Sequence, residues 1–252
     1  MPVPDTNAFS LQDVVDIMPG VQNSLQSCFD DSIDGLFDPL YKGSKTSLYN
    51  FRNYGGSMSM WFPIDGGGNG DVGYSNATWA TCRGAATGDS VDTSGSFSIY
   101  ADYTGGLYYI YRGFMRFDLS AIPVAAVIEA AGIGFDITTN YGANTTAYGY
   151  IGTQGDTLTT ADFDAFTFDE YIFNNWTDTP DPPFDDYDVE LEVVGSPQLQ
   201  TIEDTFGGYL YIALINYAHD QSNSAPTDKQ GIEIYRSGGS DDPPSLRIQF
   251  SI

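Results

Sequence analysis

YRGFMRFDLSAIP, from Tyr111 to Pro123, is a long strand-like run that stops at a proline. Together with the preceding residues it predicts a central strand over residues 107–119. One face of this strand is almost wholly apolar and carries Tyr109, Tyr111, Gly113, Met115, Phe117 and Leu119. Because successive side chains of a strand point to opposite faces, this apolar face is expected to line the core.

The opposite face of the same strand mixes apolar side chains with Arg112, Arg116 and Asp118. Charged groups at this period-two spacing can form charge-assisted hydrogen bonds with neighbouring strands. Arg247, which stands between Leu246 and Ile248 in the last expected strand, can join them. We therefore expect Arg112, Arg116, Asp118 and Arg247 to form a structural polar cluster rather than a ligand site.

The composition of the chain favours many short strands joined by turns. Its 252 residues include 28 Gly, 18 Tyr and 16 Phe, and short apolar runs alternate with Gly, Asn, Asp, Ser and Pro. Strands are expected at 57–63, 72–75, 78–84, 96–103, 107–119, 130–139, 146–152, 188–194, 208–217, 231–236 and 245–251, with a short helix at 159–165. This pattern predicts a mostly β fold, a two-sheet antiparallel jelly-roll sandwich over residues 57–252.

The charge of the chain limits its partners. The sequence has 34 acidic and 9 basic residues, a formal net charge of -25, and no Lys or Arg between Arg116 and Lys229. Such a surface repels phosphate backbones and anionic lipid, so we expect neither nucleic-acid binding nor membrane insertion. Solubility, including in a saline medium, is the simpler explanation of the excess acid.

Some of these carboxylates can instead bind a structural calcium ion, because hard cations prefer several oxygen ligands. Asp65, Asn69 and Asp71, which surround a glycine-rich loop, are the candidate ligands. The acidic segment 178–188 is a second candidate, although neither has the spacing of a recognised calcium loop. We otherwise expect no cofactor.

The cysteines and the amino terminus bear on the cellular compartment. Cys28 and Cys82 have no partner at metal-ligand or redox-motif spacing, and we interpret both as free thiols, although their pairing cannot be decided without their separation. The first twenty residues lack the basic and apolar regions of a signal peptide, and no run is long enough to span a bilayer. We expect a soluble protein that is not exported by the ordinary route.

Residues 1–56 differ from the rest and are expected to form an amino-terminal arm. Apolar residues from Phe9 to Met18 recur at helical spacing after Ser10, a capping residue, and a second helix is expected within 21–37. The apolar side chains assigned to an assembly role are Phe9, Leu11, Val14, Val15, Leu48, Phe51 and Tyr54. Short amphipathic helices must bury their apolar stripes, and a lid on the sandwich and a docking arm for a partner chain fit equally well.

No catalytic constellation stands out in the sequence. The single histidine, His219, has no nearby nucleophile motif, and carboxylate pairs carry no signal without geometry, so we expect no enzymatic activity. Binding is the better hypothesis, because aromatic residues reach 15% and sugar rings stack on exposed aromatic side chains. The candidate glycan-binding residues are Trp79, Tyr141, Tyr148, Trp176 and Tyr187, although a buried Trp176 that fixes its long loop fits as well.

Three segments together resemble the DNRLRE-type family of bacterial surface jelly rolls, which are similar to carbohydrate-binding modules. These segments are the run from Tyr111 to Pro123, IEAAGIGFDIT from Ile128 to Thr138, and the closing IEIYRSGGSDDPPSLRIQFS from Ile232 to Ser251. The resemblance spans residues 58–252, and the middle, 140–230, matches only in its short strands. It implies a jelly-roll fold, display on a surface and a structural role for the polar cluster.

Parts of the arm, SLQDVVDI, FDPLY at 37–41 and SKTSLYNFRNYG from Ser44 to Gly55, resemble an amino-terminal segment of virion and tail-region proteins of phages that infect Bacteroidota. This resemblance implies an anchor to the particle, where other virion proteins and further copies of the chain are the partners. The prediction is a non-enzymatic phage fibre, decoration or tail-region protein that contacts host surface glycans and is made in the host cytoplasm. The alternatives are a secreted or cell-surface glycan-binding module and a surface filament subunit.

Overall fold

A computed structural model of the chain describes most of the region after residue 57. The described residues are 58–142, 145–168, 171–177, 189–193, 196–236 and 243–251, with 3, 9–16, 18, 24–30, 32, 37, 43, 46–52 and 54 in the arm. Within this part of the chain, no helix is long and apolar enough to cross a membrane.

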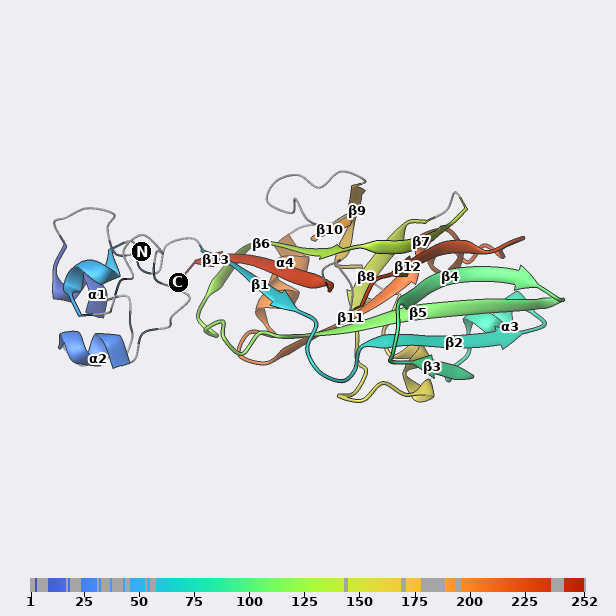
Figure 1. Cartoon of the computed structure of the whole chain (residues 1–252), viewed down its shortest axis with the longest axis horizontal. Helices are drawn as coiled ribbons and strands as arrows, with labels where there is room; N and C mark the ends of the chain where they lie inside the picture. The colour runs from blue at the N-terminus through green and yellow to red at the C-terminus, as the bar shows by residue number, and fades with distance from the viewer. Residues whose placement is uncertain are drawn as a thin grey trace.

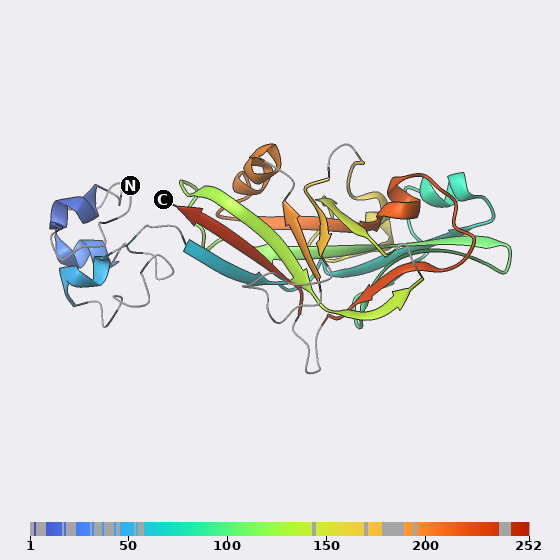
Figure 2. The ribbon, with the colours of Figure 1, turned by 90° about the horizontal axis from the view of Figure 1, so that it is seen from above.

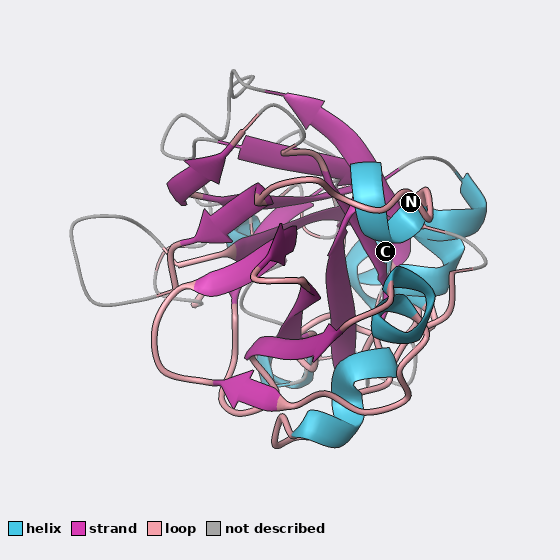
Figure 3. Ribbon diagram, turned by 90° about the vertical axis from the view of Figure 1, so that its right-hand side faces the viewer, coloured by secondary structure: helices cyan, strands magenta, loops and turns pink. Residues whose placement is uncertain are grey.

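The fold is mostly β, and the predicted antiparallel sandwich is confirmed (Figure 1). The strands are β1 (Met58–Pro63), β2 (Gly70–Asn76), β3 (Ser90–Asp92), β4 (Phe97–Thr104), β5 (Leu107–Asp118), β6 (Val127–Phe135), β7 (Ile137–Tyr141), β8 (Ala147–Ile151), β9 (Phe173–Thr177), β10 (Val189–Val193), β11 (Tyr209–Asn216), β12 (Gln230–Ile234) and β13 (Ser245–Ser251). They form one hydrogen-bonded sheet in the order β1-β13-β6-β10-β9-β8-β11-β5-β4-β12-β7, with β2 and β3 added beside β5. Seen end-on, this sheet curls into layers (Figure 3).

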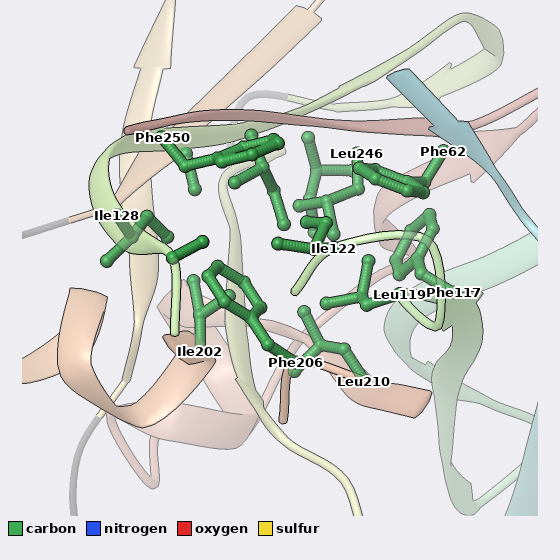
Figure 4. Close-up of a cluster of buried hydrophobic side chains, with 14 of the residues drawn as sticks. Phe62, Phe117, Leu119, Ile122, Ile128, Ile202, Phe206, Leu210, Leu246 and Phe250 are labelled. Carbon is green, nitrogen blue, oxygen red and sulfur yellow. The ribbon is translucent and has the colours of Figure 1, made fainter. Parts of the chain in front are cut away.

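Strand β5 lies where the sheet branches. Its first half pairs with β4 and its second half with β11, while β2 pairs along its other edge. An isolated bridge between Ile64 and Phe117 brings the chain after β1 back against β5, so the sheet closes on itself. The main core fills the inside of this curl (Figure 4) and includes Phe62, Phe117, Leu119, Ile122, Ile128, Ile202, Phe206, Leu210, Leu246 and Phe250.

The two faces of β5 contact two different cores. Met115, Phe117 and Leu119 lie in the main core, as the alternation predicts. The other face is buried as well, because Ile110 and Phe114 belong to a second hydrophobic cluster outside the sheet. The sequence predicts only polar bonds to neighbouring strands on this face, so the second core is a correction.

Three short helices form the outer side of the second core. They are α3 (Trp79–Arg83), the 3₁₀ turn η3 (Thr160–Asp164) and the π-helical turn η4 (Tyr217–Gln221). The helix expected after Thr159 is confirmed as η3, which Thr159 and Asp162 cap reciprocally. The strand expected at 78–84 is wrong, because this segment contains α3, which Gly84 follows as the C-cap. Helix α4 (Ser196–Glu203) was not predicted and packs beside β6.

The arm contains α1 (Leu11–Val15), α2 (Leu25–Asp30) and the 3₁₀ turn η2 (Leu48–Phe51). Ser10 caps α1 as expected, in a capping box with Asp13. The rings of Phe29, Phe37, Phe51 and Tyr54 stack or meet edge to face. These side chains are part of the same hydrophobic cluster as the main core.

The helices of the arm are drawn beyond one end of the sheet, beside the carboxyl terminus (Figures 1 and 2). Of the side chains assigned to an assembly role, Val14, Phe51 and Tyr54 are buried in this cluster. The others, Phe9, Leu11, Val15 and Leu48, are half-buried against it. The choice between a lid and a docking arm stays open.

Candidate ligand-binding surface

The largest fully buried side chain in the described part of the chain is that of Arg112, on the outer face of β5. Its Nε and Nη2 donate to the two carboxylate oxygens of Asp220 at 2.7 and 3.0 Å. Its Nη1 donates to the Phe163 carbonyl at 2.9 Å and reaches Asp164 at 3.4 Å, and Nη2 also donates to the Arg83 carbonyl at 3.0 Å. All five N–H groups of this guanidinium therefore have acceptors.

These acceptors belong to different helical segments. Arg83 ends α3, Phe163 lies in η3 and Asp220 lies in η4. The Arg112 guanidinium also sits 4.2 Å from the centre of the Phe163 ring. Arg83 itself donates to the Asp220 carbonyl. One buried charge on the sheet thus holds all three outer helices in place.

An aromatic strip lies on the outer surface of these elements. The Tyr103 and Tyr108 rings, from facing positions of β4 and β5, are 4.6 Å apart, and Tyr108 meets Trp79 of α3 edge to face at 5.7 Å. The indole Nε1 of Trp79 donates to Oδ1 of Asn223 at 3.2 Å. We call these four residues the distal strip.

Two residues of the distal strip have unusual exposure or backbone geometry. Tyr103 leaves 41% of its surface exposed, and Tyr108 and Trp79 are half-buried. Asn223 is the one non-glycine residue with a positive φ, 53°, in the described part of the chain. An asparagine tolerates this left-handed conformation better than most residues.

A second aromatic group lies at the other end of η4. Tyr148 of β8 stacks on Tyr217 of η4 with ring centres 4.3 Å apart, and Tyr171 meets Tyr148 edge to face at 4.6 Å. Tyr217 is 42% exposed. We call these three residues the lateral group. Burial, with neighbouring tyrosine hydroxyls, raises the pKa of Tyr148, so the ring stays a neutral hydrogen-bonding group near pH 7.

The β4–β5 hairpin and α3 form the end of the molecule farthest from the arm (Figures 1 and 2). The distal strip therefore lies at the pole opposite α1 and α2. Both aromatic groups can offer ring faces and hydroxyl or amide groups to a ligand.

The five predicted glycan-binding residues do not share one surface. Trp79 belongs to the distal strip and Tyr148 to the lateral group. Tyr141 lies on β7, which joins the sheet beyond β12. The Trp176 side chain, at the end of β9, and Tyr187 lie outside the described residues.

Tyr141 takes part in a different, compact contact. Its ring centre is 3.5 Å from the Lys229 ammonium, which is also 3.9 Å from the ring centre of Tyr100, and the Tyr141 hydroxyl donates to Glu233 at 2.6 Å. Gly231 lies between the two tyrosines in register and has a φ of 141°. A Cβ there would collide with the Ile99 carbonyl, so only glycine lets the rings approach. Lys229 therefore covers one face of the Tyr141 ring.

The predicted polar cluster is divided into separate networks, because the side chains bond to loops rather than across strands. Arg116 binds Asp65 and Asp156 at 2.8 Å each. Asp118 accepts from the Ser120 backbone N–H at 2.9 Å, and hydrogen bonds from the Ser120 side chain and backbone lower the pKa of Asp118. Arg247 lies in β13, whose paired neighbours are β1 and β6.

The candidate calcium ligands are also held by protein groups. The Asp65 carboxylate pairs with Arg116, and Asn69 accepts from the Arg116 N–H at 2.6 Å while donating to loop carbonyls. Asp71 points to a different partner, the Ser98 N–H, at 2.8 Å. In the described part of the chain, no group of three or more His, Cys, Asp or Glu side chains has metal-site geometry. A calcium ion at Asp65, Asn69 and Asp71 stays a prediction.

Asp71 has an unusual electrostatic environment. It is 3% exposed, and burial raises its pKa from 3.8 to about 7, helped by the neighbouring Asp92 and opposed by the Ser98 hydrogen bond. Its carboxylate lies where β4 separates from β5, opposite Gly113. Asp71 is therefore a buried group at a branch of the sheet rather than a surface group.

His219 is buried in the loop that begins with η4. Its ring nitrogens contact the Ser224 carbonyl at 2.8 Å and Oε1 of Gln230 at 3.1 Å. These bonds hold the loop that carries Asn223, so the contacts of the His219 ring are structural. Cys28 and Cys82 form no disulfide, as expected; both are buried, and burial raises the pKa of the Cys82 thiol.

No protein-family model matches the chain, and no curated protein matches it at a significant level. The resemblances to jelly-roll and phage proteins therefore stay predictions. Sequence reasoning missed Tyr103, Tyr108, Tyr171, Tyr217 and Asn223. The one usable signal was the YTGGLYY turn at 103–109, which places two tyrosines at facing positions of a hairpin.

Proposed function

We propose that the chain is a non-enzymatic structural protein of a phage particle, a fibre, decoration or tail-region component, that contacts host surface glycans. The arm docks on the particle, through other virion proteins and further copies of the chain. The sandwich displays the distal strip and the lateral group outward. The observation that carries this proposal is the opposite placement of arm and aromatic strip along the long axis (Figures 1 and 2).

The chemistry of the strip supports a glycan as the ligand. Tyr103, Tyr108 and Trp79 supply apolar ring surface together with hydroxyl and N–H groups, and the Asn223 amide lies beside them. Sugar rings have apolar faces edged by hydroxyls, which match this combination. The resemblance of the arm to virion proteins supports the particle as the location.

The non-enzymatic part of the proposal is supported by how the polar groups are used. Arg112, Asp220 and His219 are buried polar groups of this region, and each is bonded to backbone or side chains of the outer layer. A catalytic group would need a free position toward a substrate. These groups instead hold helices and loops.

Two measurements test the proposal. Mass photometry and negative-stain imaging compare the full chain with a truncated chain that begins at Ser57, and glycan-array binding compares the full chain with Tyr103→Ala. We expect defined oligomers that require the arm and array binding that requires Tyr103. Monomers in both forms would refute the docking arm, and an array without any bound glycan would refute glycan contact. Release of oligosaccharide would refute the non-enzymatic assignment.

A further inference from the structure

We infer that the aromatic surface binds along an extended, uncharged glycan chain that crosses η4, rather than the end of a chain. This inference rests on the proposed glycan contact and adds the class and the orientation of the ligand. The distal strip supplies one contact region and the lateral group a second. Four observations carry it: a common face, a long span, a fixed connection and the local charge.

The two groups lie on one face of the sheet. Trp79 and Tyr108 of the distal strip pack against the second core, and so do Tyr148 and Tyr171 of the lateral group. Tyr217, the most exposed member of the lateral group, stacks on Tyr148. A single straight ligand can therefore reach both groups without turning around an edge.

The span between the groups exceeds one sugar ring. Strands β8 and β5 are separated by β11, which gives two strand spacings of about 4.8 Å, or roughly 10 Å. In β11, Ile215 pairs with Tyr148 of β8. The adjacent residue of β11, Leu214, pairs with Gly113 of β5. Tyr108 therefore lies about four residues further along β5, roughly 14 Å at about 3.4 Å per residue. The two backbone positions are then roughly 17 Å apart, a distance that only several linked sugars can bridge.

The connection between the groups is rigid. Tyr217 begins η4 and Asn223 follows it, so the same short segment carries a residue of each group. Asp220 at its centre receives two hydrogen bonds from the buried Arg112, and His219 binds the Ser224 carbonyl. A fixed spacing between two ring surfaces favours a regular polymer over a flexible or branched tip, because little conformational entropy is lost on binding.

The charge around the surface excludes an acidic chain. Arg83 and Arg112 are the cations beneath the two groups, and both contact Asp220. Asp164, whose side chain is 50% exposed, lies in the same layer. With a formal net charge of -25 on the protein, a uronic or sialic acid polymer meets repulsion and no unpaired cation among these residues. A neutral chain is not repelled and does not need an unpaired cation to bind.

The experiment measures how affinity depends on chain length. Linear neutral polysaccharides, namely a β-glucan, an α-glucan, a xylan and a mannan, are tested beside an alginate and a polysialic acid on the full-length protein. For each polymer that binds, its partial hydrolysate is separated from disaccharide to octasaccharide, and each size is titrated by calorimetry. The variants are Tyr103→Ala in the distal strip and Tyr217→Ala in the lateral group. Tyr209→Ala, on a residue of similar exposure, 44%, near the opposite end of β5, is the matched control.

We expect a neutral polymer to bind, and affinity to rise at least tenfold between the disaccharide and the longest oligosaccharides. Tyr217→Ala should remove this rise, while Tyr209→Ala should keep it. Equal affinity for all lengths, or binding of the acidic polymers alone, would overturn the extended neutral chain and leave glycan contact intact. Binding of none of the six polymers would overturn both the inference and the proposed glycan contact.

Discussion

Replacement of Asp71 by asparagine should make the protein more stable at pH 8 and leave its stability at pH 4 nearly unchanged. The folded state holds the Asp71 pKa at about 7 against an ordinary value of 3.8, mainly because the carboxyl is buried. A group whose pKa is raised on folding binds more protons in the folded state than in the unfolded state between these two values. The stability of the wild-type protein therefore falls as pH rises from about 4 to about 7 and changes no further, for this group, above it.

The size of the effect follows from the pKa change. The rise from 3.8 to about 7 is about three units, and each unit corresponds to about 1.4 kcal/mol, so the full difference is about 4 kcal/mol. An asparagine side chain at this position keeps an oxygen that can accept the Ser98 N–H and has no charge to bury. Asp71→Asn should thus gain up to about 4 kcal/mol over the wild type at pH 8.

Urea denaturation followed by tryptophan fluorescence, at half-unit steps from pH 4 to pH 8, measures this difference directly. The difference between the two proteins isolates Asp71 from the many other carboxyls of the chain. Asp92→Asn is the matched control: Asp92 faces Asp71 in β3 but is exposed, so its removal should change the slope only slightly. Parallel stability curves for wild type and Asp71→Asn, or a less stable variant at pH 8, would show that Asp71 is not a buried, protonated carboxyl.

Three further substitutions test other parts of the structure by the same denaturation assay. Arg112→Lys should cost about 3–5 kcal/mol, because one ammonium cannot serve five acceptors and leaves the buried Asp220 underpaired; a loss below about 1 kcal/mol would contradict this role. Tyr150→Phe should be neutral or stabilising by up to about 1 kcal/mol, because the buried hydroxyl has no partner among the described residues; a clear loss of stability would reveal one. Gly231→Ala should cost more than about 1 kcal/mol and separate the rings of Tyr100 and Tyr141, because of its positive φ and the collision with Ile99; unchanged stability would rule out this packing.

The elements that sequence predicts well are those whose signals are local. The alternation from Tyr109 to Leu119 identifies the main-core face of β5, and Ser10 and Thr159 mark the starts of α1 and η3. In each case the deciding contacts lie within a few residues. The period of side chains in a strand and the bonds of a capping box need no knowledge of the rest of the chain.

The segment 78–84 shows where local signals compete. Trp79, Thr81 and Arg83 alternate with smaller residues and favour a strand by composition. The structure forms a helix there, because Cys82 can then enter the second core while Arg83 reaches Asp220. Gly84 at the helix end was the available signal for this outcome. Tertiary contacts outweigh a strand propensity of this size.

The second core could not be predicted, because its central bond joins Arg112 to Asp220 across 108 positions of sequence. From the alternation alone, the charged face of β5 is predicted to make polar bonds to neighbouring strands. A buried guanidinium is stable only when every N–H has an acceptor, so the charge requires a second layer that supplies carbonyls and a carboxylate. The phenylalanines at 163, 166 and 168 in that layer surround the same guanidinium and complete its burial.

The same requirement connects the interior of the protein to its proposed binding surface. Arg112 bonds to Arg83 of α3 and to Asp220 of η4, and these two helices carry Trp79 and Tyr217. A change at Arg112 must therefore move both aromatic groups, although the residue itself is fully buried. A substitution at Tyr103 leaves this support in place. A change at Arg112 should reduce both stability and binding, whereas a change at Tyr103 should reduce binding alone. The comparison thus separates the role of the scaffold from that of the surface that it positions.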